Sequence, residues 1–65
     1  MNNFYMERKE AYKKGTPDLR KQSRDHWTKI HIENMESGRN DLIIFSAQIL
    51  AAYDLADAEL KGDLT

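Results

Sequence analysis

The stretch that decides the fold is LIIFSAQILAAYDLADAEL, residues 42–60. Apolar side chains recur in it at steps of three and four, the spacing of one face of an α-helix. One such seam consists of Leu42, Phe45, Ile49, Ala52, Tyr53, Ala56 and Leu60. A second consists of Ile44, Ala51, Leu55 and Ala58, and a third begins with Ile43, Ala47 and Leu50. A helix that is apolar on nearly every side needs neighbours on more than one side.

Glycines separate this helix from two others. We expect a short first helix over residues 3–14, ended by Gly15 in a left-handed conformation. Thr16 then caps a second helix over residues 17–37. Pro17 takes its first position, where the helix needs no amide donor.

The apolar stretch has end signals of its own. Gly38 ends the preceding helix, and Asn40 is expected to cap a third helix over residues 41–61. Gly62 closes that helix. No stretch alternates apolar and polar residues for long, so no strand is expected. The predicted fold class is all-α, with three helices in a single domain over residues 1–65.

The middle helix is amphipathic. Its apolar face is predicted to hold Leu19, Ser23, His26, Trp27, Ile30 and Asn34, with His31 and Met35 beside it. Arg20, Lys21, Arg24 and Thr28 are predicted to lie away from that face. The first two helices offer too few large apolar side chains to cover the third. We therefore expect the surplus to pack against another protein or a second copy, giving a homodimer built as a dimeric helical bundle.

Length and composition favour the same interpretation. A chain of 65 residues makes a marginal monomer, and without cysteine it has no disulfide, so oligomerisation is the stabilising device left. The N-terminal residues show no signal peptide. The longest apolar window contains Ser46, Gln48, Asp54 and Asp57, too polar for a membrane span. We expect a cytoplasmic protein that does not enter the membrane.

The net charge of −1 conceals a separation of charge along the chain. Residues 1–32 carry a net charge of +4, and residues 33–65 carry −5. Such asymmetry can indicate binding to a polyelectrolyte. It can also mean that the two halves pair within a helical hairpin, or head to tail between two copies. Pairing is the favoured interpretation.

No motif for catalysis or metal binding is present. His26 and His31 stand five residues apart, which places them about 140° apart around a helix. Zinc ligands on one helical face need a spacing of three or four. Ser23 and Ser46 lack a glycine-containing nucleophile turn. We expect no cofactor, no metal and no enzymatic activity.

The basic middle helix supports an alternative function. Together with Lys13, the residues Arg20, Lys21 and Arg24 could neutralise phosphates in a small nucleic-acid-binding regulator. The third helix is a poor recognition helix, because phosphates would repel Asp54 and Asp57. These two carboxylates could instead imitate phosphates on a DNA-binding protein, although a solvated helix face is the simpler interpretation.

The whole chain resembles the small proteins that bacteriophages make early to bind and disable host proteins. The resemblance rests on size, absence of cysteine, segregated charge and a helical interaction surface, and it carries over no individual residue. It implies inhibition of host replication, transcription or defence machinery, in the host cytoplasm.

The sequence therefore predicts a non-enzymatic helical module that binds and modulates a larger intracellular protein. Its predicted packing and interface residues are Leu42, Phe45, Ile49, Tyr53, Leu55 and Ala56. Its predicted charged contacts are Arg20, Lys21, Arg24, Asp54 and Asp57. A structural subunit of a larger assembly is a further alternative.

Overall fold

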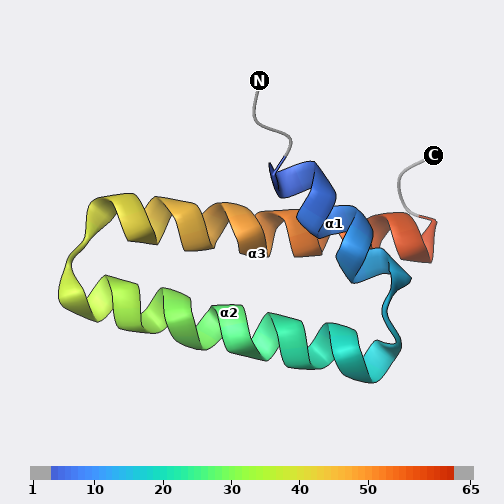
Figure 1. Ribbon diagram of the computed structural model, residues 1–65, viewed down its shortest axis with the longest axis horizontal. Coiled ribbons are helices and arrows are strands. Elements are labelled where there is room, and N and C mark those ends of the chain that lie inside the picture. The colour runs from blue at the N-terminus through green and yellow to red at the C-terminus, as the bar shows by residue number, and fades with distance from the viewer. Residues whose placement is uncertain (1–3, 63–65) are drawn as a thin grey trace.

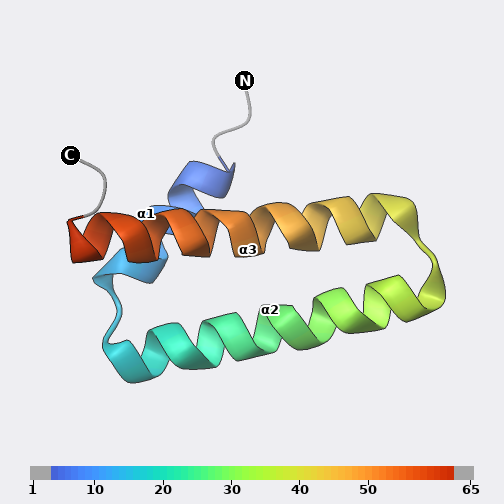
Figure 2. The ribbon, with the colours of Figure 1, turned by 180° about the vertical axis from the view of Figure 1, so that it is seen from behind.

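The computed structural model describes residues 4–62, arranged as three successive helices. Helix α1 spans Phe4–Lys14, α2 spans Pro17–Ser37 and α3 spans Asn40–Lys61. Helices α2 and α3 run antiparallel as a hairpin (Figure 1), and α1 crosses the C-terminal half of α3 on one side of it (Figure 2). The described residues contain no strand, so the prediction of an all-α fold with three helices is confirmed. Asn3, the expected start of the first helix, lies outside the described residues.

The two ends of α2 follow from its flanking residues. The side-chain oxygen of Thr16 accepts a hydrogen bond of 3.2 Å from the amide of Leu19, and Pro17 is the first helical residue. This bond satisfies one of the amides that a helix start leaves open. At the other end Gly38 adopts φ 70°, and its amide donates to the carbonyl of Met35. A left-handed conformation costs glycine little, which explains glycine at this position.

Two helix ends differ from the prediction. The cap of α3 is Arg39, whose side chain makes no capping hydrogen bond, and Asn40 is already the first helical residue. Gly15 does not adopt the positive φ of the glycines that end α2 and α3. Its carbonyl accepts a hydrogen bond from the Arg20 guanidinium instead. A side-chain donor therefore satisfies a carbonyl near the end of α1, and a left-handed residue is not needed there.

The core lies mainly between α1 and α3. The buried apolar side chains are Tyr12, Ile49, Ala52, Tyr53 and Ala56. The ring of Tyr12 stacks on that of Tyr53, with centroids 4.2 Å apart. The ring of Phe45 extends the core toward the hairpin, 5.6 Å from the Phe4 ring and 5.8 Å from the Trp27 ring. Each fully buried large apolar side chain contributes about 1.5–3 kcal/mol, and most of this burial falls on α3.

The inner face of α2 differs from the predicted one. No residue of α2 is fully buried, and its half-buried side chains include Trp27, Ile30 and Arg24. Three residues expected on or beside the apolar face are exposed: Leu19, His26 and Met35. Arg24, which was expected to lie away from that face, points toward α3 instead because two carboxylates there accept its hydrogen bonds.

Candidate functional site

One arginine joins α2 to the acidic side of α3. The two terminal nitrogens of Arg24 lie 2.8 Å from Asp54 Oδ1 and 2.8 Å from Asp57 Oδ2. The hydroxyl of Tyr12 in α1 donates to Asp57 Oδ1 at 2.9 Å, so all three helices meet here. Burial and the hydrogen bond to Asp57 raise the pKa of Tyr12 above its usual 10.0, although Arg24 acts in the opposite direction.

Two lysines join α1 to the end of α3. The Nζ atoms of Lys9 and Lys13 lie 2.8 Å and 2.7 Å from the carboxylate oxygens of Glu59. Glu10 makes longer contacts with the same two lysines. The hydrogen bonds from Lys13 and Lys9 hold the pKa of Glu59 below its usual 4.5. The basic and acidic halves of the chain thus pair with each other within one molecule.

The structure engages all five predicted charged contacts inside the chain. It brings Arg24, Asp54 and Asp57 together. Arg20 hydrogen-bonds the carbonyl at the end of α1. Lys21 pairs with Asp25 at 2.9 Å on the exposed side of α2. Contact of these five residues with a partner stays a prediction.

The six predicted packing and interface residues fall into different environments. Ile49, Tyr53 and Ala56 are buried in the core. Leu42 and Phe45 are half-buried. Leu55 is exposed. The seam that contains five of these residues faces mainly the chain's own α1 and α2, whereas Leu55 belongs to the seam whose Ile44, Ala51 and Leu55 are exposed.

A polar cluster that the sequence did not predict lies between α2 and α3. Ser46 is fully buried, and its hydroxyl lies 2.7 Å from Nδ1 of His31. The side-chain amide of Asn34 donates to the Leu42 carbonyl at 3.0 Å and to the Ser46 hydroxyl at 3.3 Å. A buried hydroxyl with no solvent access cannot attack an external substrate. These bonds instead fix how the two helices pack.

The outward-facing side of α3 carries an apolar strip. We call it the outer strip and define it as Ile44, Ala47, Ala51 and Leu55, which are all exposed. The exposed fraction is 58% for Ile44 and 42% for Leu55. Three of these residues belong to the second apolar seam of the sequence. The apolar surplus predicted for this helix is therefore present on its surface.

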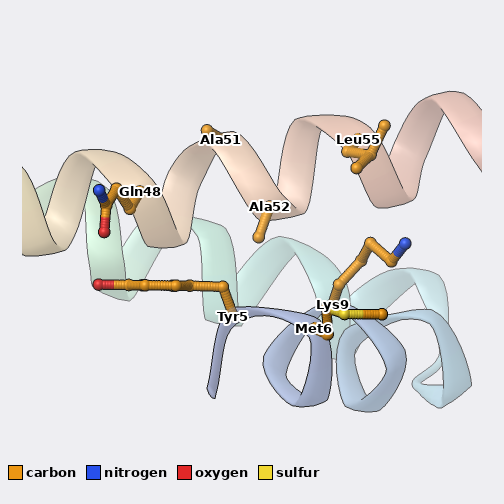
Figure 3. Close-up of a pocket in the computed structure, with 7 residues that line it drawn as sticks. All are labelled: Tyr5, Met6, Lys9, Gln48, Ala51, Ala52 and Leu55. Carbon is orange, nitrogen blue, oxygen red and sulfur yellow. The ribbon is translucent and has the colours of Figure 1, made fainter. Parts of the chain in front are cut away.

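A shallow groove of about 350 Å³ adjoins the outer strip, between α1 and α3. Figure 3 shows its lining, which consists of Tyr5, Met6, Lys9, Gln48, Ala51, Ala52 and Leu55. Ala51 and Leu55 belong to both features, which therefore form one continuous surface. Sequence reasoning missed the contribution of α1. The sequence signal for it is the adjacent pair Tyr5 and Met6, two large side chains in the first helix.

The described residues form neither a metal-binding cluster nor a membrane-spanning helix. Within residues 4–62, no group of three or more histidine and acidic side chains could hold a metal ion. None of the three helices combines the length and hydropathy needed to cross a membrane. Comparison of the chain with models of known protein families, with characterised proteins and with solved structures finds no match.

Proposed function

We propose that this protein is a non-enzymatic helical module that binds another protein through the outer strip and the adjoining groove. The main support for the proposal is that Ile44 and Leu55 are exposed on α3 and that an apolar groove lies beside them. The inner part of the fold, by contrast, leaves no buried side-chain polar atom of residues 4–62 without a partner. Contiguous exposed apolar surface is typical of interaction sites.

The charges support a protein partner rather than a nucleic acid. Three of the four basic residues on which the nucleic-acid alternative depends hydrogen-bond within the fold: Lys13, Arg20 and Arg24. The fourth, Lys21, is exposed but pairs with Asp25. Phosphates that approached the outer strip would meet Asp54, whose side chain is 71% exposed. Nucleic-acid binding therefore has less support than protein binding.

The biological effect that we propose is modulation of a larger intracellular protein. On the basis of the likeness to small phage proteins, the specific effect that we propose is inhibition of host replication, transcription or defence machinery. The proposed location is the host cytoplasm. A module of this size can inhibit by covering a functional surface of its target. Incorporation into a larger assembly as a structural subunit would use the same apolar surface.

A second copy of the chain is the other way to cover the outer strip. Sedimentation equilibrium at micromolar concentration tests this homodimer directly. A dimer that the Ala51→Glu substitution dissociates would show self-association through the strip. A monomer would leave a different protein as the partner.

The experiment that tests the proposed function is affinity capture with matched variants. Ala51→Glu places a charge in the middle of the outer strip, at an exposed position where the fold should tolerate it. Ala11→Glu is the control, with the same change at an exposed position of α1 outside the groove. We expect that the wild type and Ala11→Glu both capture a protein that Ala51→Glu does not capture. Equal retention by all three would contradict the proposed surface.

A further inference from the structure

The outer strip has an acidic residue on each flank. Asp41 and Asp54 are both exposed and lie about 70° to either side of the strip's centre by helical geometry. They are thirteen residues apart in α3, which corresponds to about 20 Å along the helix axis. A molecule lying along the strip therefore meets one carboxylate near each end, on opposite sides.

These two carboxylates are not fully neutralised within the chain. Arg24 is shared between Asp54 and Asp57, so this group keeps a net charge of −1. Asp41 makes no ion pair with any of residues 4–62. The charges beside the groove balance, because two lysines face two glutamates there. Between residues 41 and 57 the flanks of the strip therefore present a net charge of about −2 to a ligand, and the cations Arg39 and Lys61 lie beyond its two ends.

A second copy fits this charge pattern poorly. In an antiparallel pair centred on the strip, Asp41 would lie beside Glu59 of the other copy, and Arg39 beside Lys61. The antiparallel arrangement brings the like charges of Arg39 and Lys61 together, which opposes association.

The shape of the surface fits a helix. Its large side chains, Ile44 and Leu55, stand at the two ends of the strip, and Ala47 and Ala51 between them allow a helix to approach closely. The groove beside α1 extends the apolar surface to Met6. An amphipathic helix lying in an apolar groove is a common mode of recognition.

We propose that the binding element of the partner is an amphipathic helix with basic residues on both flanks of its apolar face, about 20 Å apart along its axis. It lies along the outer strip, its apolar residues contact Ile44, Leu55 and Met6, and its basic residues meet Asp41 and Asp54. This inference rests on the proposed function and specifies its partner.

A peptide library tests the inference without knowledge of the partner. The library consists of amphipathic peptides of about 20 residues, with apolar positions drawn from Leu, Ile and Ala and flanking positions drawn from Lys, Gln and Glu. We expect selection on the wild-type protein to enrich Lys on both flanks. Enrichment of Glu or Gln there, or no enrichment of any peptide, would overturn the inference.

Variants then locate the binding site of the selected peptides. We expect Ala51→Glu to weaken binding about tenfold or more, whereas Ala11→Glu leaves it unchanged. Asp41→Asn combined with Asp54→Asn should weaken it severalfold and reduce its dependence on salt, while Arg24 keeps its bond to Asp57. Equal binding by the wild type and the double variant would contradict the charge assignment.

The outcomes separate this inference from the proposed function. A captured protein that is sensitive to Ala51→Glu but binds through a neutral or acidic segment would refute the basic helix and leave the proposed function standing. A wild-type dimer that Ala51→Glu dissociates would also refute it, because the strip would then hold a second copy. Failure of both the capture and the selection would refute both proposals.

Discussion

The ring of Tyr12 lies nearly parallel to that of Tyr53, with an interplanar angle of 13° and centroids 4.2 Å apart. This contact attaches α1 to α3 across 41 residues of sequence. The hydroxyl of each tyrosine also makes a hydrogen bond: that of Tyr12 donates to Asp57, and that of Tyr53 accepts from Arg8. The position of α1, and with it one wall of the groove, depends on this pair.

Truncation of Tyr12 should therefore destabilise the whole fold. We expect Tyr12→Ala to lower the free energy of unfolding by about 3 kcal/mol, because it empties part of the core. Tyr12→Phe keeps the ring and loses only the hydrogen bond to Asp57, which is worth about 1 kcal/mol. Urea denaturation followed by circular dichroism measures both values. Equal losses in the two variants would show that the stacked ring contributes little.

Alkaline pH should weaken the fold through the same residue. The folded state raises the pKa of Tyr12 above 10.0, so it keeps the phenol proton where the unfolded chain has lost it. The resulting stabilisation is complete below pH 10 and is lost as the pH rises through the folded pKa. Urea denaturation of the wild type should show a steeper loss of stability above pH 10 than that of Tyr12→Phe. Identical pH profiles would contradict this role.

Acid should weaken the attachment of α1 to the end of α3. Hydrogen bonds from Lys13 and Lys9 lower the pKa of Glu59 in the folded state. The stabilisation from this carboxylate is therefore present above its ordinary value of 4.5 and is lost as the pH falls through the folded pKa. We expect Glu59→Gln to be less stable than the wild type near neutral pH and to show a smaller further loss in acid. If the stability of Glu59→Gln depended on pH in the same way as that of the wild type, the ion pairs of Lys9 and Lys13 with Glu59 would not be the cause.

The ion pairs of Arg24 and Lys21 should contribute differently to the free energy of unfolding. Arg24→Met removes the cation from the exposed Asp54 and from the partly buried Asp57, and we expect the free energy of unfolding to fall by about 1–2 kcal/mol. Lys21→Met removes an exposed pair with Asp25 and should change the stability by less than about 0.5 kcal/mol. Thermal unfolding of the two variants makes the comparison. A larger loss of stability in Lys21→Met than in Arg24→Met would contradict this prediction.

The sequence was sufficient to predict the helices because their signals are local. Thr16 and Gly38 act on the backbone within a few residues, and the seams of α3 follow from the helical period alone. Gly15 could not be predicted in this way, because its carbonyl is satisfied by the side chain of Arg20. That bond depends on how α2 leaves α1, which no local rule contains.

The candidate site was only partly predictable for the same reason. The sequence predicts an apolar surplus on α3 but does not assign it to one seam, because which seam α1 covers depends on contacts between distant residues. Tyr12 meets Tyr53, and Lys9 meets Glu59, over more than 40 positions. Arg24 was misplaced because its hydropathy predicts solvent, whereas its partners on α3 draw it inward.

The most direct test of the central claim is a map of the bound surface. The protein labelled with ¹⁵N is titrated with the captured partner or with a selected peptide, and the amide shifts are recorded residue by residue. We predict that the largest shifts fall on Met6, Gln48, Ala51 and Leu55, while Lys21 and Asp25 on the outer side of α2 stay unchanged. Shifts concentrated on the basic side of α2, with none at Ala51, would contradict the account.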